Sequence, residues 1–331
     1  MTRVAVLDDY QNVAASLADW SLVTKRATVD FFHEHLGDED AVVAKLADYD
    51  IVVAMRERTR FPRSVLERLP KLKMISNTGH YMAHLDLQYA HERGIVVCET
   101  VRKPGPTGAV AELSFALMLA LARNLIAEDR SIRDGHWQNG VGIQLGGKRM
   151  GVLGLGRSGE PVAKMGLAFE MDVVAWSQNL TPEHCAEVGV TYVDKETLFR
   201  TSDFIHVQLV LSRRTRGLIG AAEFAMMKPT AFLINTARGP IVDEAALLAA
   251  LHAGAIAGAA LDVFDQEPLP LDHPLRTAPR TILTPHVGYV SDNSYDTFFV
   301  QAVENITAFL DGKPVRELNP DNTSKDGVKR S

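Results

Sequence analysis

A glycine-rich segment near the middle of the chain constrains the fold more than any other feature of the sequence. The apolar run Met150–Leu153 leads into Gly154-Leu-Gly156-Arg-Ser-Gly159, and residues 160–169 follow with helical periodicity. This order predicts a strand, a tight turn and a helix. Gly154 permits the turn, Gly156 lets the backbone approach a bound group, and Gly159 lets the helix pack closely on the strand. The segment therefore predicts a strand–turn–helix unit of a parallel α/β sheet.

Short β-branched runs alternate with stretches long enough for a helix along most of the chain. The strands expected in the first part are Val4–Leu7, Ile51–Ala54, Met74–Ser76 and Ile95–Val97. Those expected in the second part are Met150–Leu153, Val173–Trp176, Phe204–Val207, Ala231–Ile234, Ala257–Leu261 and Thr281–Leu283. Strands separated by helices indicate parallel sheets, so we predict an α/β fold with two doubly wound domains.

The segments between and after the two series of strands predict the domain boundaries. A single helix is predicted from Val110 to Arg133, and the Lys103-Pro-Gly-Pro-Thr-Gly108 segment before it reads as a hinge. Apolar residues at helical spacing predict a last helix from Ser291 to Leu310. We therefore expect a discontinuous first domain, a second domain and a flexible tail, with the boundaries 1–101 and 291–318, 102–290, and 319–331.

The composition excludes several classes of protein. Of the 331 residues, 46% are hydrophobic and 23% are charged, which is typical of globular proteins with a sizeable core. The net charge of −6 argues against nucleic-acid binding, because neutralising phosphates needs a basic surface. Cys98 and Cys185 are too few for a disulfide scaffold or a four-cysteine metal site. With no signal-like start and no membrane-length apolar run, we expect a cytoplasmic protein that binds neither a membrane nor a metal.

The glycine-rich turn also predicts a dinucleotide site, because the amides at the start of the following helix attract a pyrophosphate. In NAD-binding turns of this kind, an acid about 20 residues later accepts hydrogen bonds from the ribose. Here the run Val173–Trp176 ends in Ser177-Gln-Asn179 and supplies no carboxylate. Ser177 and Asn179 can bond a ribose hydroxyl or tolerate a 2′-phosphate. The sequence therefore leaves the choice between NAD and NADP open.

Three more segments each follow a predicted strand of the second sheet. They are Asn235-Thr-Ala-Arg-Gly239, Leu261-Asp-Val-Phe-Asp-Gln-Glu-Pro268 and Thr284-Pro-His-Val-Gly288. In an open parallel sheet, ligands bind at the carboxyl ends of the strands. The segments are therefore expected to bring an arginine, a glutamate and a histidine to that edge, namely Arg238, Glu267 and His286.

The order and spacing of these motifs resemble the D-isomer-specific 2-hydroxyacid dehydrogenase family, which includes phosphoglycerate, glyoxylate and hydroxypyruvate reducing members. The resemblance extends from Asn77-Thr-Gly79-His-Tyr81 through Ala109-Val-Ala-Glu112 to the final helix. It implies a Rossmann cofactor domain and a flavodoxin-like substrate domain that flank a cleft. It also implies hydride transfer between NAD(P)H and a small 2-oxo acid or D-2-hydroxy acid, in a homodimer formed through the cofactor domain.

The resemblance assigns the substrate carboxylate to Arg238, the orientation of the histidine to Glu267, and acid–base catalysis to His286. Physical chemistry supports each role. Hydride addition to a ketone leaves an alkoxide, which a histidine that titrates near neutrality can protonate. A neighbouring carboxylate fixes the imidazole tautomer and favours its charged form. A guanidinium offers a planar fork of donors to a carboxylate.

The remaining positions that match the family are expected to contact the cofactor. Arg157 and Ser158 lie in the diphosphate loop, and Asp262 matches a position near the nicotinamide, with a buried hydrogen-bonding acid as the alternative. The full set of expected cofactor contacts is Gly154, Gly156, Arg157, Ser158, Gly159, Ser177, Asn179, Val207, Gln208, Leu209, Thr215, Thr236, Ala237, Arg238, Asp262, His286 and Gly288.

A smaller set is expected to contact the substrate, namely Arg56, Thr78, Gly79, His80, Tyr81, Arg238, His286 and Tyr289. Gly79 matches a loop whose backbone amides meet the substrate carboxylate. Tyr81 stands where the family often has glycine, which predicts a reshaped pocket. Arg56 follows a strand end and is either an extra anion contact or a solvated charge.

Two other functions compete with this interpretation, and Glu267 argues against the first of them. Formate dehydrogenase is a relative that also uses histidine, but it has glutamine where this chain has Glu267. A non-catalytic nucleotide sensor or corepressor could use the same fold, because fold does not fix function.

Trp137 resembles a tryptophan that reaches the partner's active site in some members, and packing between subunits is its alternative role.

Overall fold

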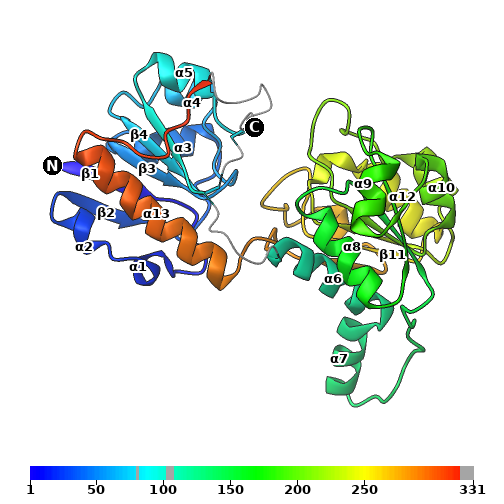
Figure 1. Ribbon diagram of the computed structural model, residues 1–331. Coiled ribbons are helices and arrows are strands. Elements are labelled where there is room, and N and C mark those ends of the chain that lie inside the picture. The colour runs from blue at the N-terminus through cyan, green and yellow to red at the C-terminus, as the bar shows by residue number, and fades with distance from the viewer. Residues whose placement is uncertain (80–81, 102–107, 321–331) are drawn as a thin grey trace. The chain divides into compact units, whose positions relative to one another are not determined.

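The structure is a computed structural model that describes residues 1–79, 82–101 and 108–320. The chain divides into two compact units (Figure 1). Unit 1 comprises Met1–Gly105 and Ser291–Ser331, and unit 2 comprises Pro106–Val290. Some of the expected features lie outside the described residues: His80, Tyr81, nearly all of the expected hinge, and residues 321–331 of the expected tail.

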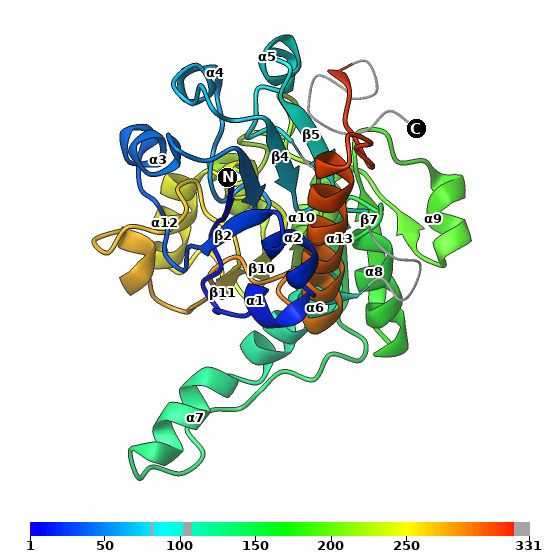
Figure 2. The same cartoon turned by 90° about the vertical axis from the view of Figure 1, so that its left-hand side faces the viewer.

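Unit 1 contains a five-stranded parallel sheet in the order β2-β1-β3-β4-β5. The strands are β1 Thr2–Val6, β2 Ala27–Phe31, β3 Ile51–Ala54, β4 Met74–Asn77 and β5 Val96–Glu99. One face is covered by α1 Ala14–Leu17, α2 Ser21–Thr24 and α13 Asp292–Leu310, and the other by α3 Glu39–Leu46, α4 Arg63–Leu66 and α5 Leu87–Glu92 (Figures 1 and 2). This is the strand order of flavodoxin-like folds.

Helix α13 packs against the sheet of unit 1 although it follows unit 2 in sequence. The side-chain amide of Asn305, which is fully buried, donates to Ser76 Oγ and to the Glu99 carbonyl, both at 3.1 Å. Gln301 exchanges two hydrogen bonds of 2.7 Å with the backbone of Val101. These bonds satisfy polar groups in β4, at the end of β5 and just after β5, so the last helix completes the first unit.

Unit 2 contains a seven-stranded parallel sheet in the order β12-β11-β10-β9-β6-β7-β8. The strands are β6 Arg149–Leu153, β7 Asp172–Trp176, β8 Thr191–Tyr192, β9 Phe204–Val207, β10 Phe232–Asn235, β11 Gly258–Leu261 and β12 Thr281–Leu283. The helices are α6 Ala109–Ala122, α7 Leu125–Arg133, α8 Gly159–Ala168, α9 Pro182–Val188, α10 Lys195–Thr201, α11 Ala221–Met226 and α12 Glu244–Ala253, with short 3₁₀ turns at Gly239–Ile241 and Pro274–Thr277. The strand order reverses between β6 and β9, as in a Rossmann fold, and the predicted fold class is confirmed.

The ten predicted strands are all present, with ends that shift by at most two residues. The sequence prediction missed β2 and β8, and both are edge strands. An edge strand has a neighbour on one side only and so buries less of its surface. Both residues of β8 are exposed, and β2 is mostly half-buried. Neither strand therefore carries the continuous apolar pattern by which the central strands were recognised.

The prediction of one helix from Val110 to Arg133 is wrong. The chain forms α6 and α7, with a bend of 59° between them. Asn124, at the break, has the left-handed φ of 52°, which asparagine adopts more readily than most residues. The prediction failed because neither glycine nor proline marks the break.

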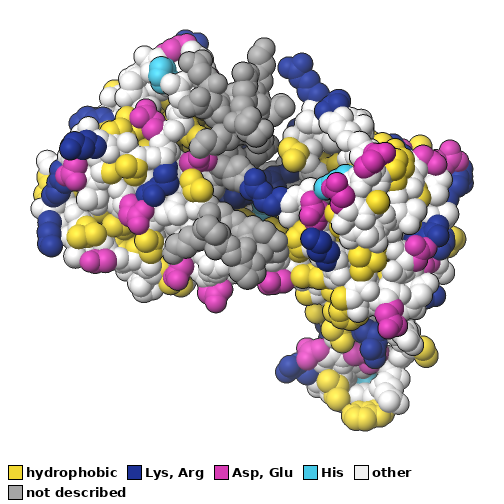
Figure 3. All heavy atoms as spheres, viewed as in Figure 1, with side chains coloured by type: hydrophobic (Ala, Val, Ile, Leu, Met, Phe, Trp, Pro, Cys, Tyr) yellow, Lys and Arg dark blue, Asp and Glu magenta, His cyan; other side chains and the backbone are white. Residues whose placement is uncertain are grey.

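Helix α7 has no buried residues and exposes several apolar side chains (Figure 3). They include Leu125, Ile126 and Ile132. Among the described residues, no single helix has both the length and the apolar character to cross a membrane; α6 and α7 meet these criteria only as a bent pair.

Candidate functional site

The carboxyl ends of the strands of unit 2 carry most of the residues expected at the site. The glycine-rich loop follows β6, and Arg238 follows β10. Glu267 lies in the loop after β11, and His286 in the loop after β12. Because all the strands are parallel, these loops leave the same edge of the sheet. The residues that the sequence placed at the site therefore lie on loops at the edge where open parallel sheets bind ligands.

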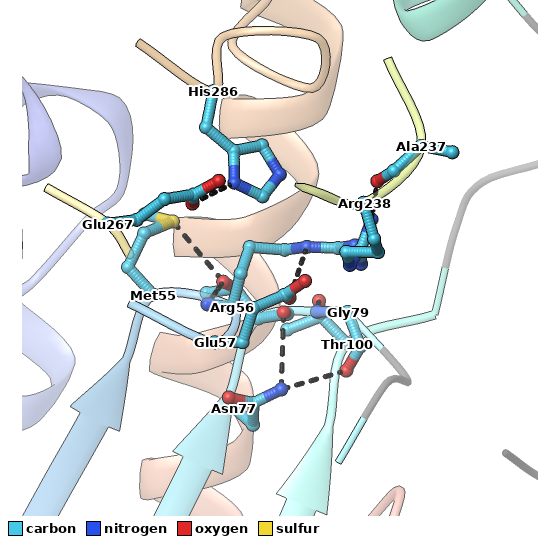
Figure 4. Close-up of polar contacts among 11 residues, drawn as sticks. Met55, Arg56, Glu57, Asn77, Gly79, Thr100, Ala237, Arg238, Glu267 and His286 are labelled. Carbon is cyan, nitrogen blue, oxygen red and sulfur yellow. Dashed lines mark hydrogen bonds and ion pairs between the residues drawn. The ribbon is translucent and has the colours of Figure 1, made fainter. Parts of the chain in front are cut away.

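His286 and Glu267 form a close pair. His286 Nδ1 lies 2.5 Å from Glu267 Oε2, with side-chain exposures of 15% and 30% (Figure 4). The other carboxylate oxygen, Oε1, accepts a hydrogen bond of 2.9 Å from the Phe264 amide. The Tyr289 ring meets the imidazole edge-to-face, with 5.5 Å between ring centroids. A carboxylate held in this way at Nδ1 fixes both the tautomer and the orientation of the imidazole.

The buried carboxylate of Asp262 holds the loop that carries His286. Its Oδ1 accepts from Thr284 Oγ1 at 2.6 Å and from the Val287 amide at 2.9 Å, and its Oδ2 accepts from the Gly288 amide at 2.8 Å. Burial raises the pKa of Asp262, and these three hydrogen bonds counter part of that rise. Asp262 therefore binds the loop on both sides of His286.

His286 itself has a φ of +52°, which is uncommon for a residue with a side chain. Such a backbone conformation persists only where its surroundings determine it strongly. The bonds from Asp262 to Thr284, Val287 and Gly288 supply that constraint. Asp262 is thus a buried, hydrogen-bonded acid that positions the histidine loop. Its expected place near the nicotinamide stays a prediction.

The segment after β10 turns tightly around Arg238. Asn235 Oδ1 accepts from the Ala237 amide at 3.0 Å, and Asn235 Nδ2 donates to the Arg238 carbonyl at 3.1 Å. A Cβ on Gly239 would lie 2.1 Å from the carbonyl carbon of Phe264, so only glycine fits there. The half-buried guanidinium of Arg238 donates from Nη1 to the Ala237 carbonyl at 2.6 Å (Figure 4).

A buried polar network lies behind the loop after β9. Gln208 Nε2 donates to Thr236 Oγ1 at 2.9 Å and to Ser114 Oγ at 3.1 Å. Ser114 Oγ in turn lies 2.8 Å from His206 Nδ1. Burial lowers the pKa of His206 to about 3, so this imidazole is neutral at ordinary pH. The sequence reasoning missed Ser114 and His206, whose only signal is a polar residue within an otherwise apolar run.

Two of the other residues expected at the cofactor contribute to local structure. The Thr215 hydroxyl closes the turn after β9: it accepts from the Ser212 amide and donates to the Val210 carbonyl, both at 2.7 Å. Val207 is fully buried in the core. Their expected contacts to a cofactor would therefore come from backbone or from the exposed side of these segments.

The glycine-rich loop has the geometry that a diphosphate needs. Gly154 has a φ of +95°, and a Cβ there would meet the Gln208 carbonyl at 2.8 Å. A Cβ on Gly159 would lie 1.9 Å from the Gly154 carbonyl oxygen, whereas one on Gly156 would meet nothing within 4 Å. The first helical hydrogen bond runs from the Glu160 amide to the Gly156 carbonyl. Other protein atoms thus pack closely against Gly154 and Gly159, whereas the space beside Gly156 is open. This arrangement fits a dinucleotide.

The loop after β7 is where an NAD-binding turn would supply an acid to bind the ribose. Ser177 is half-buried there, and Gln178 and Asn179 are exposed. No carboxylate comes from these three positions, in agreement with the sequence reasoning.

In unit 1, three of the residues expected at the substrate lie together. The Arg56 amide donates to Thr78 Oγ1 at 2.9 Å, and Arg56 has a φ of +54°. A Cβ on Gly79 would lie 2.4 Å from Arg56 Nη1, so the guanidinium rests against this glycine (Figure 4). The Gly79 amide, expected to meet a carboxylate, instead donates to Thr100 Oγ1 at 2.7 Å. Glycine at position 79 therefore makes room for Arg56.

Comparisons with known proteins agree on one family. Residues 115–288 match the model of the D-isomer specific 2-hydroxyacid dehydrogenase, NAD binding domain. A glyoxylate reductase of Thermococcus litoralis is 36% identical over 86% of this chain and 86% of its own. A D-3-phosphoglycerate dehydrogenase of Archaeoglobus fulgidus is 38% identical over 84% of this chain, which spans about half (52%) of that relative. A solved phosphoglycerate oxidoreductase from Vibrio cholerae has a TM-score of 0.88 at 33% identity, covering 94% of this chain and 100% of that one.

The glycine geometry predicts that two substitutions will weaken dinucleotide binding for different reasons. Gly156→Ala should leave the unfolding temperature unchanged, because the added Cβ meets no protein atom within 4 Å. It should still weaken NADH binding at least about tenfold, because the added methyl group occupies the space in which the backbone of the loop would approach the diphosphate. Gly159→Ala should lower both stability and affinity, since its Cβ would overlap the Gly154 carbonyl. Fluorescence titration and thermal unfolding measure the two effects, and unchanged NADH affinity in Gly156→Ala would contradict the assignment.

Proposed function

Because this chain belongs to the D-isomer specific 2-hydroxyacid dehydrogenase family, we propose that it reduces a small 2-oxo acid to a D-2-hydroxy acid with His286 as the acid–base residue. The observation that carries the proposal is the 2.5 Å contact between His286 Nδ1 and Glu267 Oε2. The pair lies at the carboxyl edge of a dinucleotide-binding sheet, where parallel α/β folds bind their ligands.

A bound nicotinamide cofactor would supply the hydride that adds to C2 of the oxo acid. The ketone oxygen then becomes an alkoxide and needs a proton. With Nδ1 directed at Glu267, Nε2 is the ring nitrogen that delivers the proton to this oxygen, and it takes the proton back during oxidation. The Glu267 carboxylate lies against Nδ1, where a negative charge stabilises the imidazolium that donates the proton.

Arg238 binds the substrate carboxylate in this proposal. A guanidinium presents parallel N–H donors that match the two oxygens of a carboxylate. The tight turn at Asn235 and Gly239 fixes the backbone of Arg238 next to the edge of the sheet. Partial burial of the side chain strengthens the interaction by excluding water.

Unit 1 supplies further substrate contacts in the proposal, and unit 2 binds the cofactor. Arg56, whose backbone amide bonds to Thr78 and whose guanidinium packs on Gly79, is the cation of unit 1 assigned to an anionic group of the substrate. The boundaries expected for these roles are 1–101 with 291–318 for the substrate, and 102–290 for the cofactor. Tyr289, in edge contact with His286, shapes the pocket beside the reacting carbon.

We also propose a homodimer formed through unit 2. Helix α7 exposes Leu125, Ile126 and Ile132, and Trp137 is 75% exposed just beyond it. A helix without a buried residue gains little packing energy within its own chain. Contact with a second copy would bury these apolar side chains.

The central test is turnover, measured as initial rates over glyoxylate, hydroxypyruvate, pyruvate, phenylpyruvate and phosphohydroxypyruvate with NADH and with NADPH. We expect His286→Ala to lower kcat by about 10² to 10⁴ on the best substrate, because proton donation is lost. NADH affinity should change much less. His252→Ala, at an exposed position of α12, is the matched control and should behave as wild type. Wild-type turnover in His286→Ala would exclude His286 as the acid.

Arg238→Lys tests the carboxylate contact. Lysine keeps the positive charge but loses the planar pair of donors, so kcat/KM should fall by about tenfold or more. The control is Arg200→Lys, an exposed arginine on α10, which should leave kcat/KM unchanged. Full activity in Arg238→Lys would show that a point charge suffices and that the bidentate contact does not form.

We further propose weak discrimination between NAD(H) and NADP(H), because Ser177 stands where an acid would repel a 2′-phosphate. Ser177→Asp should lower kcat/KM with NADPH by about tenfold, equivalent to about 1.4 kcal/mol, while sparing NADH. Steady-state rates with both cofactors measure the ratio. A ratio that Ser177→Asp leaves unaltered would show that position 177 does not face the ribose.

A further inference from the structure

His184 contacts the glycine-rich loop from the neighbouring helix. It lies in the first turn of α9, where its amide hydrogen-bonds to the Thr181 hydroxyl that caps the helix. Its Nε2 lies 3.1 Å from the Leu155 carbonyl oxygen. Leu155 is the residue between Gly154 and Gly156, and its side chain is buried. His184, which no sequence motif singled out, therefore reaches the backbone of the glycine-rich loop.

The carbonyl of Leu155 and the amide of Gly156 belong to one peptide group. In a planar trans peptide, the C=O and the N–H point in opposite directions. Holding the Leu155 carbonyl toward α9 therefore turns the Gly156 amide away from α9. Gly156 is also the position where an added Cβ would meet no protein atom within 4 Å. One hydrogen bond thus sets the direction of an amide on the open part of the loop.

Charged groups surround the His184 imidazole on both helices. On α9, Glu187 Oε2 lies 3.3 Å from Nδ1. On α8, Glu160 Oε1 lies 3.5 Å from Nε2, and Lys164 lies 3.8 Å from Glu160 Oε2. Arg157 is exposed in the loop itself. The Leu155 carbonyl first, and then Glu187, raise the pKa of His184 above its ordinary value.

We propose that His184 is a positioning residue for the cofactor, whose protonated ring holds the Leu155 carbonyl and so orients the loop for the diphosphate. The inference rests on the proposed use of this loop by a nicotinamide dinucleotide. Cofactor affinity then falls as the pH rises through the titration of His184. The chain gains a pH dependence of cofactor binding that is separate from the proton transfer at His286.

The chemistry of the ring explains the direction of the effect. The imidazolium has two N–H groups, so it can donate to the Leu155 carbonyl and to Glu187 at the same time. A neutral imidazole has one N–H and must leave a lone pair facing either the carbonyl or the carboxylate. Its charge also offsets that of Glu160, which lies in the first turn of α8, where the diphosphate binds. Deprotonation removes both contributions.

The test uses ADP-ribose, which carries the diphosphate and lacks the nicotinamide next to His286. Its Kd is measured by calorimetry between about pH 6 and pH 9, a range that spans histidine titration. For wild type, we expect the Kd to rise about threefold to tenfold across this range, the size of one hydrogen bond. His184→Gln keeps an N–H donor but does not titrate, so its Kd should be low and independent of pH. His184→Leu should bind weakly at every pH.

Two further variants separate this role from a structural one. Glu187→Gln should move the rise in Kd to lower pH, because it removes a group that favours the imidazolium. His252→Gln, at an exposed position of α12, is the matched control and should keep the wild-type pH profile. Thermal unfolding of each variant checks that the fold is intact.

The outcomes are distinguishable. A wild-type slope retained in His184→Gln, or wild-type affinity in a folded His184→Leu, would overturn the role of His184 and leave the proposed function intact. A wild-type protein that binds neither ADP-ribose nor NADH at any pH would overturn the proposed function, and this inference with it.

Discussion

The buried carboxylate of Asp262 is the constraint on which the candidate site depends. It is buried away from water and accepts hydrogen bonds from Thr284, Val287 and Gly288. These bonds join the end of β11 to the loop after β12. Removing a charged group from water costs several kcal/mol unless hydrogen bonds replace the lost hydration. Those three bonds also keep His286 at its positive φ. The position of the proposed acid–base residue is thus fixed by a group that need not touch the substrate.

The sequence predicted those parts of the fold that follow from continuous apolar runs and from glycines with a steric role. The central strands and the glycine-rich turn belong to this group, because each buries a recognisable pattern or meets backbone at close range. The break at Asn124 and the edge strands were missed, since the first depends on one left-handed residue and the others bury little surface.

The candidate site shows the same division. Arg238, Glu267 and His286 could be named from motifs that follow strand ends, and the geometry brings Glu267 and His286 into contact. The supporting bonds could not be named, because they join residues far apart in sequence. Ser114 on α6 reaches His206 on β9, and His184 on α9 reaches the Leu155 carbonyl after β6. Such contacts depend on how the helices pack over the sheet, which a local pattern does not contain.

The way α13 completes unit 1 has a consequence for the order in which the chain can fold as it is synthesised. Unit 2 has all its strands once residue 290 has left the ribosome. At that moment Ser76 and the Glu99 carbonyl still lack the amide of Asn305, and the apolar side chains under α13 are still uncovered. The part of the chain made first is therefore the part that reaches its final packing last.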